Sequence, residues 1–224
     1  MFFSLAIVSE AEELVDWYDL TQREGLYYKE KQEIPFTGEA TGQMRGRLID
    51  GLFEGSWVFY HRNGELGLEG VYLNGKREGF WKFYHDTGQR KYEGNYRDGR
   101  KHGSWKFFTY DGELLEEGDY RHGHKDGPWV AYHYFGQPRV EGDYRDGKEE
   151  GLWVSYHYNG QIRKNGAFKN GLKEGLWVTY HEDGNLRAQG KYIKGQREGY
   201  WDFYHKDGTI DPISAMYKEG VKID

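Results

Sequence analysis

The sequence contains no cysteine. Disulfide bonds and thiolate metal sites are therefore excluded, and both reducing and oxidising compartments are compatible with the chain. Positive charge is not in excess either, because 31 Lys and Arg stand against 37 Asp and Glu, a formal net charge of −6. The chain as a whole thus gives no electrostatic reason to expect nucleic acid or anionic lipid as a partner.

Long hydrophobic runs are also missing. The apolar stretch Phe2–Val8 is much too short for a transmembrane helix. With Ser9-Glu10-Ala11 after it, the stretch is typical of the end of a secretory signal peptide, although the basic leader residues are absent. We therefore expect residues 1–11 to be a signal-peptide remnant, which predicts a periplasmic or secreted protein. The alternative is an apolar strand that packs on the first repeat of a cytoplasmic protein.

Aliphatic residues are few, whereas rings are abundant. Hydrophobic residues make up only 37% of the chain, yet aromatic residues make up 18% and there are 33 glycines. Disordered chains are usually poor in aromatic residues. The composition therefore predicts an ordered protein whose core is built from rings.

Seven of the eight tryptophans recur every 24 residues, as from Trp57 to Trp81, without a slip. A glycine lies two residues before each of them and an aromatic residue three after, and His follows that aromatic residue in six of the seven copies. Self-similarity at a fixed period defines a repeat protein before any local pattern does. The tryptophans of the series are Trp57, Trp81, Trp105, Trp129, Trp153, Trp177 and Trp201.

Each copy contains two strand-like stretches and two turns. In the first copy, Trp57–His61 is rich in the aromatic and β-branched residues that suit strands. Asn63-Gly64 predicts a type I′ turn, in which both residues have positive φ, and a second strand follows over Leu66–Tyr72. After a second turn at Asn74-Gly75, the charged residues 76–78 are expected to form a link to the next copy. No residues are left for a helix.

The repeating unit is therefore a β-hairpin. An isolated hairpin is marginally stable in water, so the copies must stack. Propeller blades need roughly 40 residues, which makes this period too short for that closed fold. We predict an all-β fold, an open, twisted single-sheet solenoid of antiparallel β-hairpins.

The ends of the chain depart from the period. Residues 12–54 are expected to hold an N-terminal segment and a degenerate capping repeat, because Leu48 and Gly51 fall one period before Tyr72 and Gly75. Residues 55–220 hold the seven repeats, the last with a one-residue insertion near Asp211-Pro212, and residues 221–224 are a C-terminal tail. Terminal repeats are commonly atypical because they cap an open end.

The histidines and carboxylates do not predict an active site. Histidines at equivalent positions of successive hairpins lie roughly 10 Å apart, whereas zinc needs imidazole nitrogens at about 2.0–2.1 Å. The charged link residues alternate in sign in nearly every copy, as expected of a solvated edge and not of one acid pair. No phosphate loop or nucleophile elbow is present. We predict a protein that is not an enzyme and uses no metal and no cofactor.

The aromatic residues are the remaining candidates for function. The invariant tryptophans are predicted to fill the space between hairpins as the structural core, whereas the second residue after each tryptophan varies between Phe, Ala, Ser and Thr. Variation on a fixed scaffold is where specificity for a partner is expected. The candidate binding residues are Phe59, Phe83, Phe107, Phe203, Tyr60, Tyr84 and Phe108.

The segment Gly94–Trp105, with the pattern Gly-x-Tyr-x-x-Gly-x-x-x-Gly-x-Trp, resembles the MORN repeat. The tryptophan itself and the Trp-x-x-Tyr-His-x-x-Gly hairpin resemble the bacterial MORN-repeat variant, a branch commonly labelled YwqK-type antitoxin. The resemblance covers about residues 36–220, and Gly25–Tyr28 followed by Pro35–Gly38 resembles the N-terminal segment of secreted members.

This resemblance implies a non-catalytic scaffold that binds another protein, in some members as an antitoxin or immunity protein. Eukaryotic MORN proteins are associated with membrane lipids, which the net acidity of this chain disfavours. The alternative function is a glycan or cell-wall binding module that uses exposed aromatic rings, and a structural spacer without a ligand is a third interpretation. Protein or glycan is thus the expected partner, with no nucleic acid and no strong membrane signal.

Overall fold

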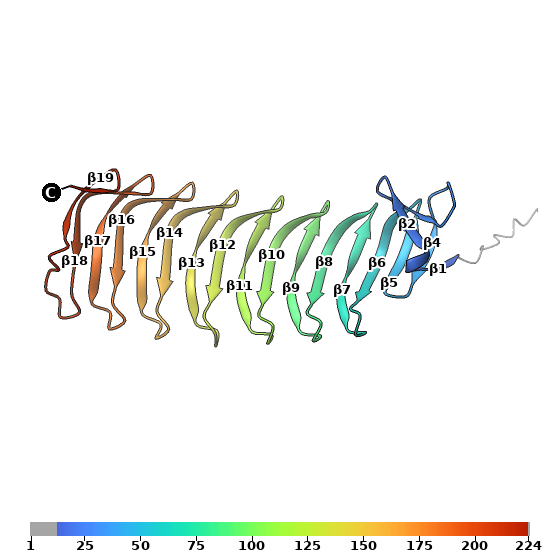
Figure 1. Cartoon of the computed structure of the whole chain (residues 1–224), viewed down its shortest axis with the longest axis horizontal. Helices are drawn as coiled ribbons and strands as arrows, with labels where there is room; N and C mark the ends of the chain where they lie inside the picture. The colour runs from blue at the N-terminus through green and yellow to red at the C-terminus, as the bar shows by residue number, and fades with distance from the viewer. Residues whose placement is uncertain (1–12, 224) are drawn as a thin grey trace, which may run out of the picture. The chain divides into compact units, whose positions relative to one another are not determined.

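A computed structural model describes residues 13–223, so the expected signal remnant at residues 1–11 lies outside the described part. The described residues contain no α-helix, and the one 3-10 turn among them is η1 (Trp17–Asp19). The chain divides into two compact units, the first comprising residues up to 88 with 96–99, and the second residues 89–95 with the chain from 100 onward. Figure 1 labels most of the strands of both units.

The first unit is built mainly from one antiparallel sheet whose strands pair in chain order from β4 to β8. Strand β1 joins this sheet by parallel pairing with β4, and β2 and β3 form a separate hairpin. The strands are β1 (Leu14–Asp16), β2 (Leu20–Arg23), β3 (Leu26–Lys29), β4 (Gly38–Thr41), β5 (Met44–Ile49), β6 (Leu52–Tyr60), β7 (Leu66–Leu73) and β8 (Lys76–Tyr84).

The second unit continues the same plan, and its strands from β10 to β20 also pair antiparallel in chain order. Strand β9 (Arg90–Arg97) is divided between the two units. The remaining strands are β10 (Arg100–Phe108), β11 (Leu114–Arg121), β12 (His124–Tyr132), β13 (Pro138–Arg145), β14 (Lys148–Tyr156), β15 (Ile162–Lys169), β16 (Leu172–Tyr180), β17 (Leu186–Ile193), β18 (Gln196–Phe203), β19 (Ala215–Lys218) and β20 (Val221–Ile223). The predicted all-β fold of successive antiparallel hairpins in an open sheet is confirmed within each unit.

The strands are longer than the sequence predicts. Residues 76–78, expected to be a link, lie inside β8, and the expected repeat boundary at residue 55 falls inside β6. The reason is a bulge, because Gly79 takes a φ of 65° and the β7–β8 register shifts nearby, so the strand bends without ending. At the other end of the chain, residues 221–223 of the expected tail form β20 and pair with β19.

The two turns of each copy differ from each other. The second turn is of the type I′ kind, since Asn74 and Gly75 have φ of 49° and 76°. The prediction of the same turn at Asn63-Gly64 is wrong, because only Gly64 of that pair has a positive φ. There the loop closes through the His61 and Gly64 amides, which donate to Glu65 and His61 carbonyls, and the Asn63 carboxamide accepts from the Glu65 amide. This longer loop of the first copy therefore needs positive φ at Gly64 alone.

The tryptophans of the repeat series are buried in both units, each at most 7% exposed. A glycine in the preceding strand makes room for each ring. A Cβ on Gly166, for example, would lie 2.3 Å from Trp177 Cδ2. The indole nitrogen of Trp177 donates to the Ala167 carbonyl at 3.1 Å, and Phe168 meets the ring edge-on with centroids 5.0 Å apart. Rings therefore replace a second layer of structure as the core.

Candidate binding face

Side chains of three kinds gather on the sheet face that carries the tryptophans, which we call the tryptophan face of each unit. Aromatic residues of neighbouring strands lie beside the tryptophans, as Tyr192 lies beside Trp177 and Trp201. The variable residue two after each tryptophan points to the same side, because alternate residues of a strand share a face. A basic residue completes the pattern in five copies.

This basic residue occupies the position four before the tryptophan, in Arg77, Lys101, Lys125, Lys173 and Arg197. Its charged group lies over the indole ring, with Lys125 Nζ 3.6 Å and Lys173 Nζ 4.6 Å from the centroids of Trp129 and Trp177. A cation over a ring face is attracted by the quadrupole of the ring, and its aliphatic stem covers the ring. The expectation that these residues belong to solvated links is wrong, because the strand continues through them and turns them onto the face.

Burial has an electrostatic consequence for these cations. It lowers the pKa of Lys101, an effect to which the nearby charge of Lys125 adds. Burial likewise lowers the pKa of Lys164, with Lys173 as the next cause. Lys125 has an acidic neighbour in Glu116, whose Oε2 lies 3.8 Å from its Nζ. Part of the cation row is thus compensated within the protein.

The carboxylates three residues before the tryptophans accept hydrogen bonds from backbone amides of the type I′ turns. Glu174 Oε2 accepts from the Lys194 amide at 2.9 Å, and Glu150 Oε2 accepts from the Asn170 amide at 2.9 Å. Lys194 is the first residue of its turn and has a φ of 48°. The recurring acids are therefore structural caps more than a solvated edge. The full set seen in this role is Glu54, Glu78, Asp126, Glu150, Glu174 and Glu198.

The histidines link neighbouring copies at the strand ends. Nε2 of His157 lies 3.0 Å from the Tyr180 carbonyl, and Nε2 of His181 lies 2.9 Å from the Tyr204 carbonyl. A carbonyl only accepts, so Nε2 carries the proton in each case. Among residues 13–223, no group of three or more His, Asp or Glu is placed to hold a metal ion.

The predicted binding residues fall on two different faces. Phe59, Phe83, Phe107 and Phe203 lie on the tryptophan face, where Phe83 is itself buried and Phe107 packs against Trp105 with centroids 6.1 Å apart.

The tyrosines of the predicted set point to the opposite side of the sheet, as Phe108 does by its position. The Tyr84 hydroxyl donates to Glu69 Oε1 at 2.9 Å. The same pair recurs as Tyr132 with Glu117 and Tyr156 with Glu141, where desolvation and the carboxylate raise the pKa of Tyr132 to about 12. The structure thus does not bring the predicted residues together into one surface.

A groove lies on the tryptophan face at the C-terminal end of the second unit. It has a volume of about 520 Å³. Thr179 and Ala188, which face each other across β16 and β17, form the low part of its floor, between Lys164 and Phe203 on the outer strands. Large side chains at either position would fill this space. We call it the C-terminal groove, and sequence reasoning missed it.

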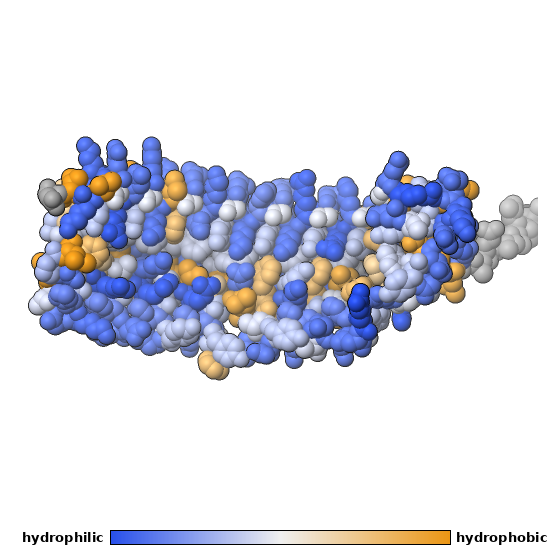
Figure 2. Space-filling view, in the orientation of Figure 1, coloured by the Kyte–Doolittle hydropathy of each residue, from blue (hydrophilic) through white to orange (hydrophobic). Residues whose placement is uncertain are grey.

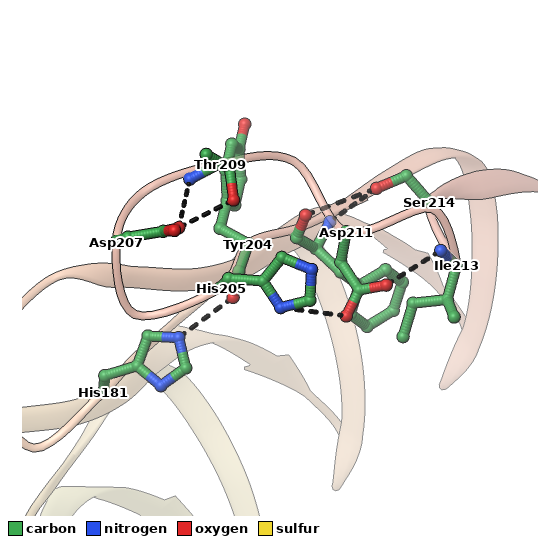
Figure 3. Close-up of polar contacts among 9 residues, drawn as sticks. His181, Tyr204, His205, Asp207, Thr209, Asp211, Ile213 and Ser214 are labelled. Atoms are coloured by element: carbon green, nitrogen blue, oxygen red, sulfur yellow. Dashed lines mark hydrogen bonds and ion pairs between the residues drawn. The ribbon is translucent and has the colours of Figure 1, made fainter.

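The loop that leads from β18 to β19, drawn in Figure 3, contributes Lys206, Asp211 and Ile213 to the lining of the groove. Asp211 holds this loop, since its Oδ1 accepts from the Ile213 amide at 3.0 Å and its Oδ2 lies 3.8 Å from His205 Nδ1. The expected insertion at Asp211-Pro212 thus gives the last hairpin a wall that the other copies lack. Its sequence signal was the break in period, but nothing in that break specifies a groove.

These features define an all-β repeat protein with an open, ring-filled sheet. The family model described as MORN repeat variant matches residues 77–98, 101–122, 149–170 and 173–194. Each matched segment runs from the position of the basic residue to the first residue of the type I′ turn. MORN repeats are suggestive of a scaffold, commonly one that binds membranes or proteins, and the family is generally non-catalytic. No curated protein matches the chain. The described residues contain no helix long and apolar enough to span a membrane.

Proposed function

We propose that the protein is a non-catalytic scaffold that binds another protein through its tryptophan face. The observation that supports this proposal is that invariant and variable residues of that face have different roles. The repeated tryptophans and glycines pack against each other. The residues that differ between copies lie side by side across neighbouring strands. Lys164, Thr179, Ala188 and Phe203 form one such row.

The glycan alternative is less well supported by the geometry. Sugar rings stack on exposed aromatic faces, but the tryptophans of the series are at most 7% exposed and several carry a cation over the ring. Hydrophilic residues also cover most of the surface drawn for the second unit in Figure 2, with hydrophobic residues in small separate groups. Rings that are highly exposed, such as Phe135 and Tyr158, lie in hairpin loops and not on the tryptophan face.

More specifically, we propose an antitoxin or immunity-type role, in which the scaffold covers a toxin. Export to the periplasm is the location that this role implies. The support for this form is the similarity to the repeat variant alone. A toxin gene beside the gene of this protein, and rescue of growth when both are expressed together, would support it. Unchanged killing in the presence of the scaffold would contradict it.

Affinity capture followed by binding with purified components tests the general proposal. The wild-type chain is compared with a Ser155→Phe, Thr179→Phe variant, in which the small variable residues take the residue that other copies carry. We expect the wild type to retain a protein that binds again when purified and that the variant binds more weakly. A wild type that binds no purified protein, or a variant with full affinity for every captured protein, would count against the tryptophan face as the binding surface.

A further inference from the structure

The lining of the C-terminal groove is strongly basic in an otherwise acidic protein. Five of its side chains are Lys or Arg and one is a carboxylate, that of Asp211, whereas the chain as a whole has 31 basic against 37 acidic residues. The five basic residues lining it are Lys164, Lys173, Arg187, Arg197 and Lys206. The local charge is thus opposite in sign to that of the molecule.

Four of these cations are not paired with an acidic side chain in the described part of the chain, and Arg197 Nη1 donates to the neutral Tyr217 hydroxyl at 3.2 Å. No carboxylate of residues 13–223 lies within ion-pair distance of Lys164, Lys173, Arg187 or Arg197. Asp211 is turned toward His205 and the Ile213 amide. Lys125, two copies toward the N-terminus from Lys173, differs in that Glu116 Oε2 lies 3.8 Å from its Nζ. The groove therefore concentrates positive charge that has no ion-pair partner among the described residues.

The shape of the groove explains why this charge is accessible. Thr179 and Ala188 are small, so nothing covers the space between the Lys164 and Phe203 strands. Lys173 and Arg197 occupy equivalent positions of successive copies, which places them roughly 10 Å apart. Charges spread over that distance match several carboxylates along a chain better than they match one phosphate group, whose oxygens span only a few ångströms.

We propose that the C-terminal groove binds an acidic polypeptide segment, with carboxylate side chains directed at Lys173 and Arg197 and small side chains over Thr179 and Ala188. The inference rests on the proposed function and specifies the chemistry of the partner. Carboxylates pair with Arg through two parallel hydrogen bonds, and complementary charge raises the rate and selectivity of association. The tryptophans under the cations hold them in place and do not contact the segment.

Fluorescence anisotropy with a labelled ten-residue glutamate peptide tests the site. The uncharged comparison probe is a Gly-Ser peptide of the same length, and inorganic phosphate and vesicles containing phosphatidylglycerol are separate ligands. We expect the wild-type chain to bind the glutamate peptide in a salt-sensitive manner and to ignore the Gly-Ser peptide. Preferential binding of phosphate or of the vesicles through the same residues would overturn the polypeptide assignment.

Two kinds of variant separate charge from shape. Lys173→Met with Arg197→Met keeps the stems over the rings and removes the charge, and we expect the Kd for the peptide to rise about tenfold or more. Thr179→Phe changes no charge and fills the floor with the residue found at Phe59, Phe83, Phe107 and Phe203, and we expect a rise of about fivefold. Circular dichroism melts verify that each variant is folded.

Lys125→Met is the matched control, because Lys125 also lies over a tryptophan but outside the groove. We expect it to change the Kd less than about twofold. If the control and the groove variants lose the same affinity for the peptide, the peptide is bound by general charge attraction and the assignment of the groove is overturned. If a captured protein still binds the Thr179→Phe chain fully, the inference fails while a binding scaffold stands. If the peptide binds in the groove but no protein is ever captured, the proposed function fails instead.

Discussion

At the scale of single residues, glycine and tryptophan specify each other. The ring of Trp177 occupies the place that a side chain on Gly166 would take, and the same pairing occurs at Gly190 with Trp201. Protein interiors are close-packed, so an added atom at such a site must displace its neighbour. The glycines of the strands are therefore as much a part of the core as the rings are.

Gly166→Ala should destabilise the second unit. The new Cβ would lie 2.3 Å from the fused ring atom Cδ2 of Trp177, and overpacking of this kind costs about 1–3 kcal/mol. Urea unfolding followed by tryptophan fluorescence measures the change. Lys169→Ala, an exposed change in the same strand, is the control and should have a small effect. Equal midpoints for the two variants would mean that the indole shifts freely.

Tyr156 gives a pH-dependent test on the opposite face. Its hydroxyl donates to Glu141, and this hydrogen bond, together with burial and the carboxylate charge, raises its pKa to about 12. The protonated phenol is favoured in the folded state, so its stabilising contribution is complete below about pH 10 and is lost as the pH rises through about 12. Tyrosinate absorbance, as the difference between the wild-type chain and Tyr156→Phe, reports this titration.

Glu141→Gln should bring the pKa of Tyr156 down toward about 10, because the amide removes the negative charge that opposes the phenolate. The control is Glu182→Gln, an exposed change in a hairpin loop. A Tyr156 titration that is identical with and without Glu141 would show that the carboxylate has no part in the shift.

At the scale of elements, one strand supplies both the cation that covers a tryptophan and the carboxylate that caps a turn. A strand such as β16 carries Lys173 toward the ring of Trp177 and Glu174 toward the Lys194 turn, then bends at Gly175, whose φ is 71°. The sequence predicts two strands and two turns for each copy. It could not predict that the charged residues lie within a strand, because a bulge glycine and a loop glycine have the same sequence signature.

Glu174→Ala should loosen the turn between β17 and β18. A charge-assisted hydrogen bond to the Lys194 amide is lost, at a turn residue that already holds a φ of 48°. We expect a loss of about 1–2 kcal/mol and faster hydrogen exchange at the Lys194 amide. Glu174→Gln, which keeps an acceptor, should lose less. Unchanged exchange in the alanine variant would argue against the capping role.

At the scale of the whole molecule, the fixed period of the sequence means that a complete 24-residue copy is the unit that can be added or removed. Within the second unit each strand pairs with the strands next to it in the chain, and stability in such arrays is a sum of copies and nearest-neighbour contacts. Addition or removal of one complete copy should therefore preserve the register of all the others.

Deletion of residues 148–171 removes β14 and β15 and joins Gly147 to Leu172, so that a turn glycine still precedes a strand. We expect a folded chain with the circular dichroism of β structure and a lower Tm. Deletion of residues 148–161 removes β14 and the loop after it, so β13 is followed directly by β15, a strand that runs parallel to β13 in the wild-type sheet and has no matching register with it. The single-strand deletion should fail to unfold cooperatively, and equal melts for the two deletions would contradict nearest-neighbour packing.

The sequence by itself determined the repeating hairpin and the burial of its tryptophan, because a fixed period and turn glycines follow from local backbone chemistry. It also indicated the place of the broken period near Asp211. Only the tertiary structure decided that Lys173 and Arg197 lie over rings beside a hollow left by Thr179 and Ala188. The physical reason is strand pairing. The register brings together residues from four strands, and the face to which each points depends on a bulge that the sequence does not reveal.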